Sequence, residues 1–242
     1  MNLIIDIGNT RVKTAVFEGD KIVSRHIFGK SRLLSEIKKI IENYKIGATI
    51  ISSVSSITSK KLEKLHKLVP YLLVSPEINT PFKNLYSTPK TLGVDRMALV
   101  FGAVIIYPNH NVLIIDAGTC ITFDFVNKKK EYLGGAISPG IEMRYKALNK
   151  FTSKLPLLEI SKPLHFIGIS TNESIHSGVV NGVIQEIDGV IEQYKNKYLH
   201  LTVVLTGGDA NFLSKQLKSS IFANQNFILE GLNKMLIFNK SK

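Results

Sequence analysis

Cysteine, tryptophan and long hydrophobic runs are scarce or missing in this sequence of 242 residues. Cys120 is the only cysteine, so no disulfide can form within the chain, and this favours a reducing, cytoplasmic setting. The longest apolar run, residues 97–107, is far shorter than the ~20 residues that a membrane-spanning helix needs. Asp6 interrupts the apolar N-terminal stretch and no basic region precedes it, so we expect neither a signal peptide nor a membrane anchor.

Acidic residues are outnumbered, since 31 Lys and Arg against 19 Asp and Glu give a net charge of +12. The positive charge is almost entirely lysine, because the arginines are only Arg11, Arg25, Arg32, Arg96 and Arg144. A surface that binds nucleic acid is usually lined with arginine and aromatic residues, so we expect no nucleic-acid partner. The same positive field would still attract a polyanion such as ATP.

A strand that ends in aspartate and then turns through glycine occurs twice in the chain. LIIDIGNT places Asp6 at the end of one such strand, and VLIIDAGT places Asp116 at the end of another. Each is followed by two more strand-like runs and then by helical segments. The repeat predicts a duplicated α/β protein with domains at residues 1–110 and 111–242, packed closely because no flexible linker separates them.

The chemistry of these turns fits a site for a metal ion and a phosphate. Glycine lets the backbone approach a ligand closely, and turn amides can cradle phosphate oxygens. The carboxylate needs a hard cation such as Mg²⁺ between itself and the phosphate. For either copy alone, a plain hairpin in which Asp6 and Asn9 bind turn amides is the better interpretation, whereas two copies favour a phosphate clamp across a cleft. Two further glycine turns, at 134–140 and 206–210, carry a weaker signal.

Seven ordered motifs between residues 6 and 210 resemble the type III pantothenate kinase family: DIGNTRVK, LGVDR, DAGTCITFD, GGAISPG, LNKFTSKLP, STNESIHSG and TGGDA. The resemblance implies two RNase H-like domains of the acetate and sugar kinase, Hsp70 and actin superfamily, with ATP in a cleft between them. It also implies transfer of the γ-phosphoryl group of ATP to the primary hydroxyl of pantothenate, the first step toward coenzyme A. The sequence departs from the family pattern at Thr88 and Ser170, where the family often has asparagine.

The resemblance also implies roles for individual residues. ATP would be bound by Asp6, Ile7, Gly8, Asn9, Thr10, Arg11, Val12, Lys13 and Thr119. Pantothenate would be bound by Tyr86, Gly93, Val94, Asp95, Arg96 and Thr171. Asp6 is assigned to Mg²⁺, and Asp116 to a monovalent cation, K⁺ or NH₄⁺, although the chemistry of Asp116 alone allows Mg²⁺ as well.

Asp95 is the predicted general base, and its alternative role is that of a helix N-cap. A helix N-terminus would keep its carboxylate ionised and hence weakly basic, which phosphoryl transfer tolerates because it demands little early proton abstraction. Arg96 is suited to the carboxylate of pantothenate or to a phosphoryl oxygen, with a surface salt bridge as the alternative.

Other functions on the same fold are a non-catalytic regulator, since the family includes accessory-factor proteins, and a sugar or acetate kinase, whose chains are usually much longer. The presence of Asp6, Asp95, Asp116 and Thr119 favours a kinase.

The family is dimeric, and the helix predicted at 175–191 is apolar at more positions than one core-facing stripe requires. We therefore predict a homodimer with a second apolar face that includes Val183 in the interface; the alternative is a helix buried on both sides within its own domain.

Overall fold

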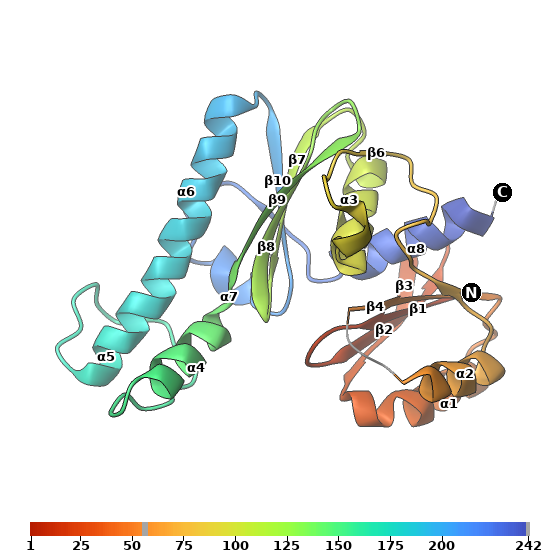
Figure 1. The fold of residues 1–242 in the computed structure, drawn as a ribbon, viewed down its shortest axis with the longest axis horizontal. Coiled ribbons are helices and arrows are strands. Elements are labelled where there is room, and N and C mark those ends of the chain that lie inside the picture. Colours follow the sequence, from red (N-terminus) through yellow and green to blue (C-terminus); the bar gives the residue numbers. More distant parts are fainter. Residues whose placement is uncertain (55–57, 241–242) are drawn as a thin grey trace. The chain divides into compact units, whose positions relative to one another are not determined.

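A computed structural model describes residues 1–54 and 58–240, and its chain forms two compact units (Figure 1). Unit 1 consists of Met1–Asn109, Lys129–Leu133 and Asn226–Lys242, and unit 2 consists of His110–Lys128 and Gly134–Gln225. The predicted domain boundary falls next to the first change of unit. Compact units need not coincide with duplicated domains, so the division at residues 110 and 111 stays a prediction.

The sheet of unit 1 has five strands in the order β3-β2-β1-β4-β5. At its centre, β1 (Asn2–Ile7) is antiparallel to β2 (Val12–Glu18) and parallel to β4 (Ala48–Ser53). β3 (Lys21–Phe28) and β5 (Leu72–Leu73) lie at the edges. Because both faces of the central strand are covered, β1 is a nearly continuous run of buried apolar residues rather than an alternating one.

Two pairs of helices cover the faces of this sheet (Figure 1). On one face, α1 (Leu33–Asn43) and α2 (Ser59–Leu68) contribute buried leucines and isoleucines at helical spacing to a common core. On the other, α3 (Val94–Ile106) packs against α8 (Phe227–Lys240), and both helices contact the central strands. The two helices approach so closely that a Cβ on Gly231 would lie 2.3 Å from the carbonyl oxygen of Ala98.

Short elements connect β5 to α3. They are β6 (Lys83–Asn84), which pairs in parallel with Glu131 and Tyr132, and a 3₁₀ turn, η2 (Pro89–Thr91). A further 3₁₀ turn, η1 (Lys30–Arg32), leads into α1. The pairing of β6 matters for function because it ties the irregular stretch before α3 to a fixed position in unit 1.

Unit 2 repeats the strand order of unit 1. The second sheet has the order β11-β10-β7-β8-β9-β6, in which β6 belongs to unit 1 and the other five match β5-β4-β1-β2-β3. In it, β7 is antiparallel to β8 and parallel to β10. The strands are β7 (Asn111–Ala117), β8 (Cys120–Val126), β9 (Glu131–Pro139, which begins in unit 1), β10 (Leu201–Thr206) and β11 (Phe222–Ala223). The shared topology confirms the predicted duplicated α/β fold, in which β1 corresponds to β7 and β4 to β10.

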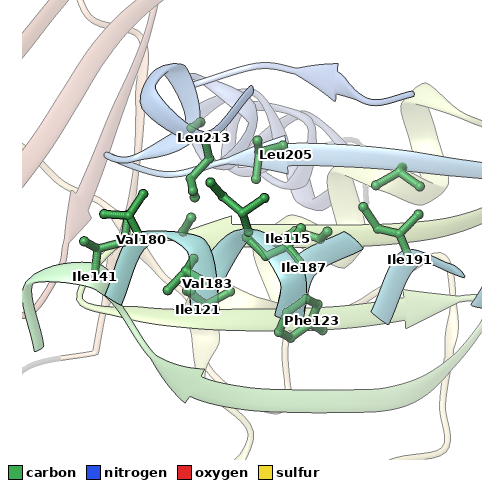
Figure 2. Packing of buried hydrophobic residues seen from close by; sticks show 14 of the residues in the cluster. Ile115, Ile121, Phe123, Ile141, Val180, Val183, Ile187, Ile191, Leu205 and Leu213 are labelled. Atoms are coloured by element: carbon green, nitrogen blue, oxygen red, sulfur yellow. The ribbon is translucent and has the colours of Figure 1, made fainter. Parts of the chain in front are cut away.

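The helices of unit 2 include one long helical segment with a change of pitch. α5 (Thr171–His176) continues through a turn of π-helix, η3 (Ser177–Asn181), into α6 (Gly182–Lys197). The remaining helices are α4 (Ile141–Phe151) and α7 (Ala210–Ser214). Figure 2 shows side chains of α6 packed against those of the strands and of α7.

The predicted second apolar face at Val183 is wrong. Val183 is 0% exposed, and it lies with Ile187 and Ile191 in the core of unit 2 (Figure 2). The helix is apolar at many positions because Ile175, Val179 and Ile184 are buried in the same core. An apolar stripe wider than usual therefore reflects burial within its own unit, and the exposed apolar residues are found elsewhere.

No helix among the described residues is both long enough and apolar enough to cross a membrane.

Candidate active site

The first glycine turn joins β1 to β2 at the carboxyl end of β1. Its backbone is closed by a hydrogen bond from the Gly8 N–H to the Arg11 carbonyl oxygen at 3.1 Å. The next residues, Asn9, Thr10 and Arg11, are exposed. The hairpin and the exposed loop are thus both present, but the Gly8 amide is used inside the turn and does not face a ligand.

Two of the residues assigned to ATP by resemblance are core residues of this hairpin. Ile7 and Val12 pair with each other in the sheet, and both are 0% exposed. Asp6 pairs with Lys13, so the two side chains point to the same face of the sheet. Asp6 is only 5% exposed, and Lys13 is half-buried. The carboxylate and the ammonium group therefore lie next to the turn, where they can bind a metal-bound phosphate.

The second glycine turn has the same placement in unit 2. Asp116 is half-buried at the end of β7, and Thr119 is exposed in the turn between β7 and β8. The Gly118 N–H donates to the Cys120 carbonyl oxygen at 2.9 Å, and the Gly140 N–H donates to the Thr119 carbonyl oxygen at 3.2 Å. The glycine-rich loop at 134–140 therefore braces the turn that carries Thr119.

The third glycine turn, after β10, packs directly on the end of β7. Gly207 has φ +98°, and a Cβ there would lie 2.4 Å from Asp116 Oδ1 and 2.2 Å from the Ala117 carbonyl oxygen. Only glycine fits this position. The Asp209 N–H donates to the Ala117 carbonyl oxygen at 3.0 Å, which fixes this turn against the second glycine turn.

Asp209 is a candidate that sequence reasoning did not single out. Burial, and to a lesser degree the negative charge of Glu142, raises the pKa of the Asp209 carboxyl to about 6. The only signal was its membership of the TGGDA motif, because nothing in the sequence shows that Glu142, at the start of α4, lies within electrostatic reach of it.

Asp95 lies in the first turn of α3, and the N-cap is Gly93. The expectation of a low pKa is wrong, because burial raises the pKa of the Asp95 carboxyl. The hydrogen bond from the Arg96 N–H to Oδ1, at 2.8 Å, lowers this pKa, but by less than burial raises it. A raised pKa makes the carboxylate a stronger base than one exposed at a helix N-terminus.

Gly93 leaves room for the Asp95 carboxylate. A Cβ on Gly93 would lie 2.4 Å from Asp95 Oδ1, which is closer than real Cβ contacts. Val94, which separates Gly93 from Asp95 in the sequence, is the first residue of α3 and is half-buried. The carboxylate therefore folds back over the glycine that precedes the helix.

Aromatic rings hold Arg96 in place. The guanidinium carbon of Arg96 lies 5.6 Å from the centroid of the Tyr86 ring, and that ring stacks on Tyr132 with centroids 6.1 Å apart. Arg96 is 6% exposed. The structure thus brings Tyr86, Asp95 and Arg96 together within unit 1, and it adds Tyr132, which sequence reasoning missed because a tyrosine in a strand carries no functional signal.

Thr171 belongs to unit 2, where it is exposed as the first residue of α5. Ser170, one of the departures from the family pattern, is the N-cap of that helix: its Oγ accepts from the Glu173 N–H at 3.3 Å. Glu173 in turn accepts from the Ile169 N–H at 2.9 Å, which ties the residue before the N-cap to the first turn of the helix. Serine replaces asparagine here without loss of the cap.

Thr171 also lines a cavity of about 1150 Å³. The wall is mostly apolar, with Arg144 as its one cation among the described residues; the other lining residues include Leu148, Phe151, Leu155, Ile169, Ile175 and Val179. Arg144 donates from Nε to the Pro139 carbonyl oxygen at 2.9 Å and forms an ion pair with Glu186. This arginine therefore joins the cavity wall to the loop that braces the second phosphate turn.

The donor groups near the turns suit a hard cation that keeps most of its water. Among the described residues, no cluster of three or more His, Cys, Asp and Glu side chains could hold a metal ion. Asp6 and Asp116 each offer one carboxylate next to a phosphate-type turn. Mg²⁺ in nucleotide sites is typically held by one or two carboxylates, waters and the phosphates themselves, so these residues fit it.

Known proteins match this chain over its full length. The family model described as type III pantothenate kinase matches residues 2–193. The type III pantothenate kinase of Christiangramia forsetii is 49% identical over 243 residues, covering 100% of both chains. That of Flavobacterium johnsoniae is 47% identical over 234 residues, covering 96% of each.

Solved structures share the fold at lower identity. A conserved protein assigned to the Baf family of transcriptional activators, from Campylobacter jejuni, has a TM-score of 0.65 and 20% identity, covering 99% of this chain and 100% of that one. A ROK family glucokinase from Streptomyces griseus, solved with glucose and AMPPNP, has a TM-score of 0.52 and 11% identity, covering 100% and 99%. At these identities the likeness concerns the fold alone, which is that of the actin-like ATPases and sugar kinases.

Proposed function

Because this chain belongs to the type III pantothenate kinase family, an ATP-dependent kinase of coenzyme A biosynthesis, we propose that its chemistry is carried by the residues at the start of α3. The reaction transfers the γ-phosphoryl group of ATP to the primary hydroxyl of pantothenate. The supporting observation is the Asp95 carboxylate, which is half-buried, has a raised pKa and lies beside Arg96.

In this proposal Asp95 accepts the proton of the pantothenate hydroxyl. The transition state of phosphoryl transfer is loose, so the proton moves late and the base mainly orients the attacking oxygen. Burial keeps the carboxylate poorly solvated, which favours its hydrogen bond to a substrate hydroxyl over one to water. A pKa raised toward the working pH also makes the proton transfer itself more favourable.

Arg96 and Tyr86 form the proposed pantothenate contacts of unit 1. The guanidinium group carries a fixed positive charge that can pair with the pantothenate carboxylate in two parallel hydrogen bonds. The Tyr86 ring stacks on Tyr132 and lies under Arg96, so its edge and hydroxyl are the groups proposed to contact the substrate. Gly93, Val94 and Thr171 complete the proposed set.

The phosphate turns carry the proposed ATP contacts. In unit 1 they lie within residues 6–13, where the buried Ile7 and Val12 support the turn from the core, and in unit 2 the contact is Thr119. Asp6 would hold Mg²⁺, which when bound neutralises charge on the phosphates, and Lys13 adds a positive charge on the same face of the sheet. Asp116 would hold a monovalent cation, K⁺ or NH₄⁺.

A homodimer is proposed from the exposed apolar residues between α4 and α5. Within 151–169 these side chains are mostly uncovered: Phe151 (80% exposed), Leu157 (57%), Leu164 (84%), Phe166 (82%), Ile167 (74%) and Ile169 (87%). Such a concentration of large apolar side chains marks an interaction surface. A second copy of the chain is the proposed partner, and Thr171, two residues after Ile169, would place part of the pantothenate site at this interface.

The single cysteine supports a cytoplasmic location.

The non-catalytic alternative receives no support from the curated relatives, because those that are 47% and 49% identical to this chain are named as kinases. The decisive experiment is a coupled assay of ADP release by the purified protein with ATP, Mg²⁺ and pantothenate, with and without K⁺. We expect turnover that requires pantothenate and is stimulated by K⁺. An equal rate of ADP release with and without pantothenate would refute pantothenate as the substrate. An equal rate with and without K⁺ would refute the monovalent cation site.

A further inference from the structure

Ser52 lies beside Asp6 at the edge of the unit 1 sheet where the phosphate turn begins. β1 and β4 are parallel, and Asp6 and Ser52 are register partners, each one residue before the end of its strand. Register partners point to the same face, and neighbouring strands are about 4.8 Å apart, so the two side chains are neighbours. Carboxyl ends of parallel strands form the edge where open α/β sheets bind ligands.

The hydroxyl of Ser52 has no function in the fold that the structure reveals. Ser52 is 0% exposed, and among the described residues its Oγ has no hydrogen-bond partner. Buried hydroxyls are normally hydrogen-bonded, since leaving one unpaired lowers stability. An alanine would pack at this position without that cost, so the location of the hydroxyl beside Asp6 is the feature to explain.

The same arrangement occurs at the corresponding place in unit 2. Thr206, on β10, is the register partner of Asp116, and its Oγ1 is also buried without a partner among the described residues. β10 corresponds to β4 in the shared strand order. A buried, unpaired hydroxyl next to the turn aspartate therefore occurs in both halves of the duplicated fold, which argues against an accident of packing.

We propose that Ser52 is a positioning residue for Asp6. Its Oγ–H donates a hydrogen bond to the Asp6 carboxylate, directly or through one buried water, when that carboxylate turns its other oxygen toward the Mg²⁺ of the nucleotide. A carboxylate that binds a metal is commonly held from behind by such a donor, which fixes its orientation. This inference rests on the proposed role of Asp6 in the metal site.

The test is Ser52→Ala in the full chain, with calorimetric binding of a non-hydrolysable ATP analogue measured with and without Mg²⁺. We expect Mg²⁺-dependent binding to weaken about 10-fold, the lower end of what loss of such a supporting donor costs. Metal-free binding of the analogue and the melting temperature of the free protein should not fall. The Mg²⁺ concentration that half-saturates turnover should rise by a similar factor.

Thr49→Val is the matched control. Thr49 lies on the same strand, is 2% exposed and also has an Oγ1 without a partner among the described residues, but it is the register partner of Leu3 and faces α1 and α2. It should bind Mg²⁺ and nucleotide like the wild type. Equal losses in both variants would overturn the inference, because the effect would then come from the strand as a whole.

The Asp6→Asn variant distinguishes the positioning role of Ser52 from the proposed metal-binding role of Asp6, on which it rests. If Asp6→Asn loses Mg²⁺-dependent binding while Ser52→Ala keeps it, the positioning role is refuted and the metal assignment of Asp6 stands. If Asp6→Asn keeps Mg²⁺-dependent binding, the metal assignment itself is refuted, and the role of Ser52 with it.

Discussion

Replacing Gly93 by alanine tests the catalytic assignment without touching a charged group. An ideal Cβ at this position lies 2.4 Å from Asp95 Oδ1, and ordinary contact begins at 3.4 Å, so the carboxylate oxygen has to retreat by about 1 Å. The backbone itself tolerates alanine, because Gly93 has φ −59°. The added methyl group therefore acts on one atom of the proposed base.

Displacement of the base by about 1 Å should lower kcat roughly 10²-fold, since positioning supplies most of the rate in this reaction. Stability should change by less than about 1 kcal/mol, because the slightly poorer N-cap and the lower entropy of the unfolded chain nearly offset each other. KM for ATP should stay within about threefold, since no proposed nucleotide contact moves.

The measurements are steady-state kinetics with both substrates and thermal unfolding of the same preparations. Gly29→Ala is the matched control: Gly29 is also an N-cap with negative φ in unit 1, but its nearest neighbour to a new Cβ is 4.0 Å away. It should behave like the wild type in both measurements. A Gly93→Ala enzyme with wild-type kcat would show that the position of the Asp95 carboxylate does not limit turnover.

Three further predictions follow from the same structure. Asp95→Asn should lower kcat about 10²–10⁴-fold while leaving ATP binding intact, and it should raise the melting temperature at neutral pH, because burial raises the pKa of Asp95 and so penalises its charged form; an unchanged kcat would leave Asp95 a structural residue. Asp209→Asn should stabilise the protein, free of metal and nucleotide, above pH 6, and the gain should vanish below pH 4, since the penalty of the charged carboxyl grows between the ordinary pKa of 3.8 and the shifted value of about 6; a gain independent of pH would refute the shift. Phe166→Glu should give monomers in sedimentation, whereas Leu199→Glu, at a residue 81% exposed outside 151–169, should not; dimers of Phe166→Glu would place the interface elsewhere.

The repeated architecture could be predicted from sequence because its signal is local. Each half opens with an apolar strand ending in aspartate and glycine, and both turns are found where that pattern puts them. The return of α8 to unit 1 could not be predicted, since an apolar helix at 227–240 carries no mark of the sheet on which it packs. The prediction of an interface at Val183 was wrong for a related reason. Apolar periodicity shows how wide the apolar stripe of a helix is, but not which part of the protein covers it.

Within the candidate site, the grouping of three residues could be predicted, whereas their roles stay a prediction and the electrostatics could not be predicted. Tyr86, Asp95 and Arg96 were assigned together, and they are neighbours in unit 1. The raised pKa of Asp95 depends on burial in the folded chain, and the stacking of Tyr86 on Tyr132 depends on the pairing of β6 with β9. Such properties come from tertiary contacts, which a motif does not encode.

The packing of α8 has a consequence for synthesis on the ribosome. Most of unit 1 is made before unit 2, yet one face of its sheet is covered by residues 227–240. At a translation rate of ~5–20 residues per second, roughly ten seconds or longer pass between synthesis of the central strands of unit 1 and synthesis of α8. Chaperones usually protect strands that are exposed in this way. Unit 2 is made without interruption by α8 and can complete its core first. A released chain that ends at residue 225 would therefore hold all of unit 2 but lack the helix that covers one face of the unit 1 sheet.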